Sequence, residues 1–270
     1  MPSTTGKSYV IGKGRLYFDA FLPGTKTPTG ERYLGNSPEL SSTIAQDTLD
    51  HIDADQGLNV KDDQVTIQND LTGAFVLDSI ENANVALWYG GDTETVSVLA
   101  ATGVTDPDTT IKRGRFYQIG TSDINPSGTR KVVNVVVSSV VPAVVPTDPP
   151  VVTVIPNANN FDIDLELGRI YVEADAPGLT DTTVLRVTYD QEAIVRETTI
   201  AKGDEVRGAM RFIANNPHGP DKDYFWPYVK VTSNGDYALK GDSWQQMSFT
   251  YEALKRDDTV DRLYIDGRSA

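Results

Sequence analysis

KDDQVTIQNDLTGAFVLDSIENANVALWYGG, residues 61–91, carries the clearest folding signals in this chain. Its first half alternates with a period of two, which is typical of a β-strand with one solvated face. Its second half predicts a helix over residues 79–89, with Asp78 as N-cap and Glu81 completing a capping box. Gly90-Gly91 is expected to end that helix. The stretch therefore predicts a strand followed directly by a short helix.

The strand in this stretch is polar and acidic. One predicted face carries Asp62, Gln64, Thr66, Gln68 and Asp70. The surrounding residues 39–81 contain ten acidic side chains and one basic side chain, Lys61, which gives −9 of the net charge of −14. The sequence thus predicts one wet strand face that carries no cation.

The rest of the chain shows the same β-rich pattern. Short runs of Val, Ile, Tyr, Phe and Thr alternate with Gly, Asn, Asp and Pro, which is typical of an all-β sandwich or barrel. We expect residues 183–190 to pair with 194–200, and residues 229–239 to form a hairpin with Asn234-Gly235 at its tip. The further expected strands are 16–21, 95–100, 115–120, 131–137 and 247–251.

A proline-rich segment, residues 139–155, divides the chain. Because proline cannot donate to a sheet ladder, we interpret this segment as an extended linker or as an arm that docks on a neighbouring subunit. On that reading the chain is a single domain, residues 1–270, built from two β-rich halves, 1–138 and 156–270.

The overall composition excludes several functions. A net charge of −14 argues against a surface that grips nucleic acid, because such surfaces neutralise phosphates with Lys and Arg. With no cysteine, disulfide scaffolds and thiolate chemistry are excluded. Residues 1–18 lack an apolar stretch of signal-peptide length, and no window approaches a membrane span, so we expect no membrane association.

The sequence offers little for catalysis. The two histidines, His51 and His218, lie near no nucleophile motif. His51, Asp53 and Asp55 share a predicted strand face, but hard cations need more convergent oxygen ligands, so we expect no metal. We therefore predict no catalytic residue, no cofactor and no enzyme activity.

Two other segments are candidates for a functional surface. Asp162, Asp164 and Glu166 alternate with apolar residues and predict a second acidic stripe, for which a solvated outer face is the alternative. Tyr224-Phe225-Trp226 belongs to an aromatic run that suits a stacking platform for sugars or bases. We favour packing in the core or at a subunit interface for that run.

Several segments, in this order along the chain, resemble the tail tube proteins of long-tailed, non-contractile bacteriophages. They are GKGRLYFDAFLPG (12–24), ERYLGNSPELSST (31–43), the opening stretch (61–91), RGRFYQIG (113–120), DLELGRIYV (164–172), RGAMRFIANNPHGPDKDYFWPYVKVTSNGDYALKGD (207–242) and WQQMSFTYEALK (244–255).

This resemblance implies a β-sandwich with one flanking helix, whose inner sheets form a ring-shaped barrel when the chain assembles as stacked hexameric rings. It implies that DNA passes through the bore without specific binding, that the partners are other copies, the tape-measure protein and the tail terminator and tip proteins, and that the protein is assembled in the host cytoplasm and resides in the virion tail. It also implies that a long hairpin over residues 40–70 reaches between subunits and rings.

The acidic stripes and the hairpin give specific candidates within this family. The candidates to line the bore are Asp62, Gln64, Thr66, Gln68, Asp70, Asp162, Asp164 and Glu166. The candidates for contacts between subunits are Asp47, Asp50, His51, Asp53, Asp55, Tyr224, Phe225 and Trp226. The alternative from another class is a β-rich phage adhesin or receptor-binding protein, and a carbohydrate-active enzyme is a third possibility.

Overall fold

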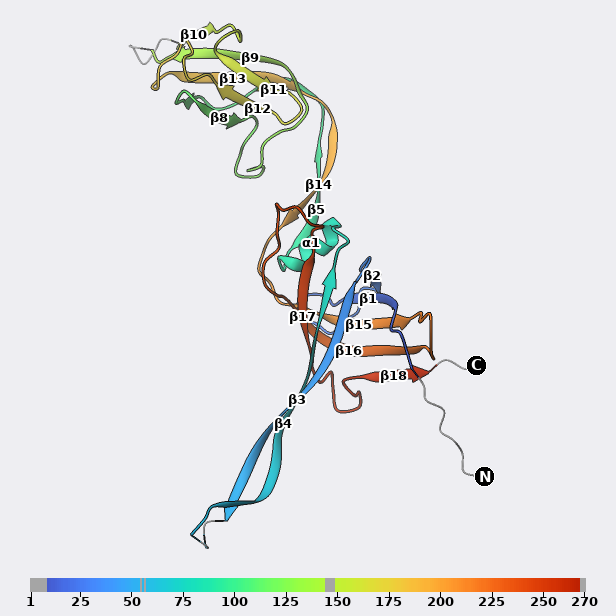
Figure 1. Cartoon of the computed structure of the whole chain (residues 1–270). Helices are drawn as coiled ribbons and strands as arrows, with labels where there is room; N and C mark the ends of the chain where they lie inside the picture. Colours follow the sequence, from blue (N-terminus) through green and yellow to red (C-terminus); the bar gives the residue numbers. More distant parts are fainter. Residues whose placement is uncertain (1–8, 54, 56, 144–148, 268–270) are drawn as a thin grey trace. The chain divides into compact units, whose positions relative to one another are not determined.

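The computed structural model describes residues 9–53, 55, 57–143 and 149–267 (Figure 1). The fold is mainly antiparallel β-sheet with one short helix, which confirms the predicted fold class. The chain divides into two compact units. Unit 1 contains residues 1–94 and 198–270, and unit 2 contains residues 95–197. In the described ranges, none of the helices has the length and apolar character needed to cross a membrane.

Unit 1 is built on one sheet that curls into a half-barrel. The strand order is β2-β1-β15-β16-β17-β4-β3, and β18 pairs with β16 beside β17. The bounds are β1 Gly14–Ala20, β2 Arg32–Tyr33, β3 Glu39–Asp53, β4 Val60–Leu77, β15 Val206–Ala214, β16 Lys222–Ser233, β17 Met247–Ala253 and β18 Tyr264–Gly267.

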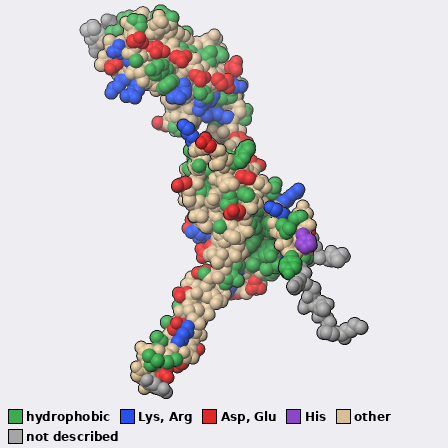
Figure 2. Space-filling view, in the orientation of Figure 1, with side chains coloured by type: hydrophobic (Ala, Val, Ile, Leu, Met, Phe, Trp, Pro, Cys, Tyr) green, Lys and Arg blue, Asp and Glu red, His purple; other side chains and the backbone are tan. Residues whose placement is uncertain are grey.

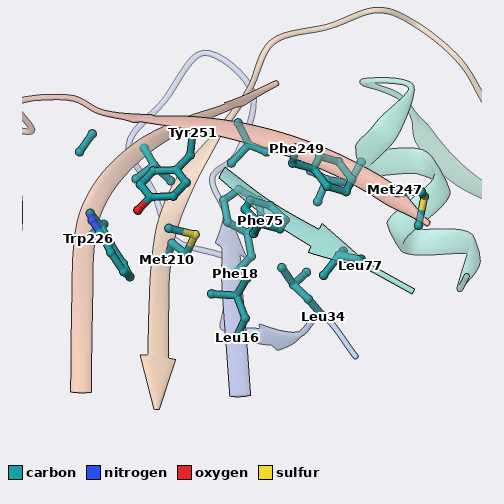
Figure 3. Packing of buried hydrophobic residues seen from close by; sticks show 14 of the residues in the cluster. Leu16, Phe18, Leu34, Phe75, Leu77, Met210, Trp226, Met247, Phe249 and Tyr251 are labelled. Carbon is teal, nitrogen blue, oxygen red and sulfur yellow. The ribbon is translucent and has the colours of Figure 1, made fainter. Parts of the chain in front are cut away.

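Large apolar side chains from these strands fill the inside of the curl (Figure 3). Phe249 is fully buried, and its ring lies 4.9 Å from Phe75 and 5.3 Å from Trp88 between centroids. Gly73 allows β4 to lie close to Tyr251, because a Cβ at this position would lie 2.5 Å from the Tyr251 ring. The period-two apolar pattern of β17 thus places its buried side chains on the core face.

The helix α1, Asn82–Trp88, begins later than the sequence predicts. Its N-cap is Glu81, which makes no side-chain cap bond, so the predicted Asp78 cap is wrong. Asp78 instead accepts a hydrogen bond from the side chain of Asn36 at 2.7 Å. The helix start is fixed by buried Asn84, whose amide donates to the carbonyls of Leu34 and Ser79. Its end at Gly90-Gly91 is as predicted.

Unit 2 contains two further sheets. One has the order β10-β9-β13-β6, with β7 also on β13, and the other has the order β11-β12-β8. The bounds are β6 Ala101–Thr105, β7 Thr109–Thr110, β8 Arg115–Gln118, β9 Val132–Val141, β10 Val151–Val154, β11 Phe161–Asp164, β12 Arg169–Val172 and β13 Val184–Gln191. Strands β5, Asp92–Val98, and β14, Ile194–Ile200, pair with each other and connect the units.

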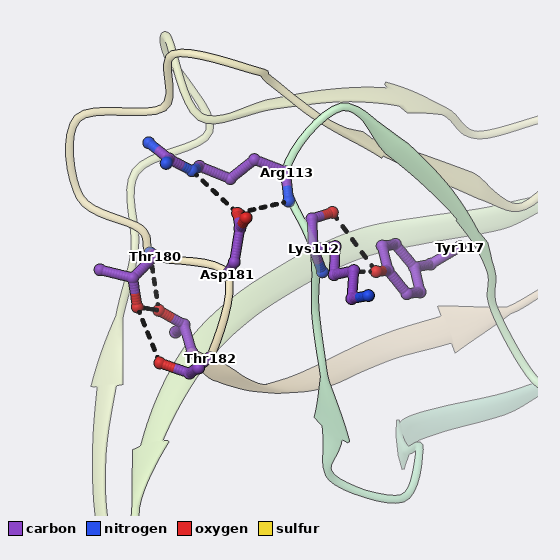
Figure 4. Close-up of polar contacts among 7 residues, drawn as sticks. Lys112, Arg113, Tyr117, Thr180, Asp181 and Thr182 are labelled. Carbon is purple, nitrogen blue, oxygen red and sulfur yellow. Dashed lines mark hydrogen bonds and ion pairs between the residues drawn. The ribbon is translucent and has the colours of Figure 1, made fainter.

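A polar cluster ties two loops of unit 2 together (Figure 4). Asp181 accepts hydrogen bonds from the backbone N–H and the guanidinium of Arg113, at 3.2 and 3.1 Å. These bonds hold the pKa of the Asp181 carboxyl below its usual value. Nearby, the backbone N–H of Lys112 donates to the hydroxyl of Tyr117 at 2.7 Å. The cluster fixes the segment before β8 against the segment before β13.

The division into units differs from the predicted two halves. The proline-rich segment does not link two lobes, because its two ends, Ser139–Val141 and Val151–Thr153, pair as antiparallel strands within unit 2. Residues 144–148, in the middle of this segment, lie outside the described residues. Unit 2 is instead an insertion between the two chain segments that form unit 1.

Two predicted strand pairings are wrong because, in each case, other strands already pair with the edges of the strand concerned. Strand β13 pairs with β9 on one edge and with β6 and β7 on the other, so β14 pairs with β5 instead. Strand β16 pairs with β17, not with residues 236–239, because β17 supplies the buried apolar face. Asn234-Gly235 lies in the loop between them.

Candidate functional site

The most unusual feature of unit 1 is a two-stranded extension that we call the ribbon, residues 45–70. Residues 71–77 of β4 pair with β17 on one side, and residues 71–76 pair with β3 on the other. Within the described residues, β4 pairs only with β3 from Asp70 outward. Figure 1 shows the two strands leaving the sheet together as one hairpin. The long hairpin predicted over residues 40–70 is therefore present, and both edges of its outer part are open.

Two β-bulges in β4 decide which side chains share a face of the ribbon. The register shifts between Asp47/Thr48 and between His51/Ile52, so Ile67 and Asp62 are the extra residues. Residues directly opposite each other point to the same face, and each bulge shifts the alternation by one residue. The face that we call the acidic face carries Ala45, Asp47, Leu49, His51, Asp53, Val60, Asp62, Asp63, Val65, Gln68 and Asp70. The opposite face carries Gln46, Thr48, Asp50, Ile52, Lys61, Gln64, Thr66 and Asn69.

Side-chain contacts agree with this assignment of faces. On the acidic face, His51 Nδ1 lies 2.5 Å from Asp62 Oδ1, and Gln68 donates to Asp70 at 2.7 Å. On the opposite face, Lys61 Nζ lies 2.6 Å from Asp50 Oδ1. The ribbon's one basic residue therefore neutralises a carboxylate on the opposite face, and five carboxylates remain on the acidic face.

The predicted bore-lining stripe is consequently split. Asp62, Gln68 and Asp70 share the acidic face, whereas Gln64 and Thr66 lie on the opposite face. A strict period of two assumes a regular strand, and the sequence around Ile67 contains no glycine or proline that signals a bulge. The structure adds two carboxylates to this face: Asp63, which the period-two pattern placed on the other face, and Asp47, which was predicted as a contact between subunits.

Five of the predicted contact residues lie on the ribbon, with Asp47 near its base and the other four farther out. Asp47, His51 and Asp53 lie on the acidic face, and Asp50 lies on the opposite face. Asp55 lies in the turn, where its N–H donates to the side chain of Asp53 at 2.9 Å. No set of three His, Asp or Glu side chains within the described residues is arranged to hold a metal ion.

The ribbon also exposes large apolar side chains. An isolated two-stranded hairpin is only marginally stable in water, and a contiguous exposed apolar patch usually marks an interaction surface. Half or more of the side chain is exposed at each of seven large apolar residues on or beside the ribbon. They are Ile44, Leu49, Ile52, Leu58, Val60, Val65 and Ile67.

The second acidic stripe is shorter than predicted. Strand β11 ends at Asp164, and residues 165–168 form a turn. Glu166 lies in that turn, so it does not share a strand face with Asp162 and Asp164. Asp164 itself accepts a hydrogen bond from the N–H of Leu167 at 2.8 Å, which closes the turn. Leu165 and Leu167 are about half exposed, so they form no buried strand face.

The aromatic run lies in β16 and does not act as one surface. Trp226 is 1% exposed and belongs to the core of unit 1, so it is removed from the candidates for contacts between subunits. Tyr224 is partly buried beside it, with ring centroids 5.9 Å apart. Phe225 points to the other face, where the guanidinium of Arg211 lies 4.2 Å from its ring. Core packing, one of the two roles favoured from sequence, is confirmed for Trp226.

Comparison with known proteins gives a family but no described activity. No curated protein sequence matches the chain. A family model described as protein of unknown function UCP028589 matches residues 9–260. That match covers both units and the whole ribbon, so this chain belongs to the UCP028589 family.

Proposed function

We propose that this protein is the tail tube subunit of a long-tailed bacteriophage, a structural protein that assembles into stacked hexameric rings. The observation that carries the proposal is the ribbon. Its backbone has open edges within the described residues, large apolar side chains on or beside it are exposed, and its two strands extend beyond the sheet of unit 1. These features suit a segment that other copies of the chain cover, because open strand edges and exposed apolar patches are natural docking elements.

The size of such an assembly agrees with the passage of DNA. If six subunits each give four strands to a closed barrel, with about 4.8 Å between strands and a tilt near 45°, the circumference is roughly 160 Å. This circumference corresponds to a bore wide enough for a DNA duplex with room for side chains. The tape-measure protein would occupy the same bore before DNA, and the terminator and tip proteins would close its ends.

Within the ribbon, we assign the bore-lining role to the base of the acidic face. Asp47 and Gln68 are directly opposite each other there, and Asp70 follows on the same face. An anionic wall repels phosphate, whereas a cationic wall releases counterions and binds DNA. The assembled protein would then reside in the virion tail, where DNA slides past without adhering.

Charge reversal at the base of the acidic face is expected to slow DNA ejection. Particles with Asp47→Lys and Gln68→Lys should eject DNA more slowly by about tenfold or more, because each added cation can contact a phosphate. The measurement is the rate of DNA release from intact particles triggered in vitro. The matched control, Asp50→Lys with Asn69→Lys, adds the same charge on the opposite face and should leave the rate nearly unchanged. Equal rates for both variants would remove these residues from the bore.

A second candidate function is a receptor-binding tail protein, which one surface of unit 2 favours. Phe116 is 58% exposed, the ring of Tyr171 lies 4.7 Å from it, and the guanidinium of Arg169 lies 4.5 Å from it. Exposed aromatic clusters of this kind often mark binding sites. Sedimentation of the purified protein separates the two candidates. A tube subunit gives monomers or very large species, whereas a receptor-binding protein gives one small oligomer of fixed size.

A further inference from the structure

One end of the unit 1 core borders a cavity. A cavity of about 1300 Å³ lies where the bases of β3 and β4 meet β1, β15 and β16. Its apolar lining includes Leu16, Phe75, Tyr224, Trp226 and Tyr251. Figure 3 shows that Trp226 and Tyr251 lie at the end of the core away from the helix. The helix therefore covers one end of the core, and buried Trp226 and Tyr251 at the other end form part of the cavity floor.

The cavity contains an unsatisfied hydrogen-bond donor. Trp226 Nε1 is buried and has no hydrogen-bond partner among the described residues. Buried polar groups are almost always hydrogen-bonded, and a donor without a partner needs an explanation. Since the indole lines the cavity, a backbone carbonyl from an open strand edge seated there is one way to satisfy it.

The cavity is also bordered by positive charge, in contrast to the rest of this acidic chain. Lys13, Arg15 and Lys222 contribute to its lining, and Glu39 is the one carboxylate among the described lining residues. None of the three cations forms an ion pair within the part of the chain that the structure describes. Figure 2 shows hydrophobic side chains gathered in a recess beside the base of the hairpin. The occupant of the cavity should thus combine apolar and anionic groups.

The outer part of the ribbon has that chemistry. On its acidic face, Leu49 and Val65 are directly opposite each other and are both exposed. Asp62 and Asp63 follow Val65 on the same face toward the tip. An apolar cross-strand pair flanked by carboxylates complements an apolar cavity bordered by lysine and arginine.

We propose that the outer acidic face of one copy's ribbon docks in this cavity of a second copy. Leu49 and Val65 enter the cavity, and Asp62 and Asp63 lie against Lys13 and Lys222. The proposal deepens the proposed function and rests on it for the identity of the partner. Between the level of Ile44 and the tip, β3 spans about 30 Å at 3.3 Å per residue, so the ribbon reaches well beyond its own unit.

The absence of cysteine makes a direct test possible. One preparation carries Val65→Cys and a second carries Lys222→Cys, both at accessible positions of the full chain. After mixing and mild oxidation under assembly conditions, we expect a disulfide-linked heterodimer as the main product. The matched control is Gln64→Cys, one residue away on the opposite face, which should give several-fold less product. Introducing Lys13→Glu into the Lys222→Cys chain should lower the yield, and Asp63→Lys in the Val65→Cys chain should restore it.

The outcomes separate this docking from the proposed function. If the protein forms tubes but Val65→Cys gives no more heterodimer than Gln64→Cys, the docking is wrong and the tube function stands. If the Val65–Lys222 disulfide forms but only a small closed oligomer results, the docking stands and the tube function fails. If neither the disulfide nor any assembly appears, the docking is overturned.

Discussion

Replacing residues 48–67 with an Asn-Gly turn is expected to abolish tube formation while the stability of unit 1 hardly changes. The deletion joins Asp47 to Gln68, which are already directly opposite each other in the register. A two-residue Asn-Gly turn suits such a connection. The removed side chains are almost all exposed, and in the part of the chain that the structure describes the removed strands pair only with each other. The folded core therefore loses no buried contact, whereas neighbouring subunits lose the segment that we propose joins them.

Two measurements on the shortened protein check this expectation. The Tm in a thermal melt should stay within a few degrees of the full chain, because surface changes away from special features usually cost less than about 0.5 kcal/mol. Electron microscopy should show no filaments under conditions where the full chain forms them. Filaments of normal appearance from the shortened chain would refute the role of the ribbon in assembly.

The second large effect is expected in the core, where Phe249→Ala should destabilise unit 1 by about 3–5 kcal/mol. Phe249 is fully buried between Phe75 and Trp88, so truncation removes two aromatic contacts and leaves a cavity. At about 2–4 °C per kcal/mol for a unit of this size, the Tm should fall on the order of 10 °C. Denaturant unfolding followed by tryptophan fluorescence measures the change.

Trp244→Ala is the matched control for this core substitution. Trp244 lies three residues before Met247 and is 92% exposed, so its removal should change the stability by less than about 0.5 kcal/mol. Because that substitution also removes a fluorophore, far-UV circular dichroism should accompany the fluorescence measurement. A comparable loss of stability in both variants would contradict the assigned core.

Side-chain alternation predicted most strands of the fold correctly. The strand expected over residues 247–251 is present, and its alternating residues Met247, Phe249 and Tyr251 are buried in the core. The strands expected at 16–21 and 62–70 are also present. Alternation reports which face of a strand is buried, and burial is what these residues share. Strand partners were predicted less well, because an edge is filled by whichever segment buries more apolar surface. The pairing of β14 with β5 is an example.

The candidate site was predicted in position but not in detail. The hairpin and its acidic character followed from the sequence, whereas the two bulges did not, since a bulge adds a residue without a required residue type. The cavity beside Trp226 also had no sequence signal. It joins residues from segments far apart in the chain, such as Leu16, Phe75 and Trp226, and only the curl of the sheet brings them together.

The insertion of unit 2 was missed because its valine-rich proline segment resembles a linker. Proline excludes a residue from donating in a ladder, yet it does not prevent the flanking valines from pairing. Val151 and Val152 pair with Val141 and Val140, on the side of β9 away from β13. Prolines between two β-branched runs are therefore as compatible with a hairpin as with a linker.

Electron cryomicroscopy of the assembled protein tests the central claim most directly. The account predicts hollow cylinders of stacked six-fold rings, with the base of the acidic face, Asp47 and Asp70, toward the bore. A small closed oligomer without a channel, or placement of this chain at a fibre tip or in the capsid shell of the virion, would contradict it.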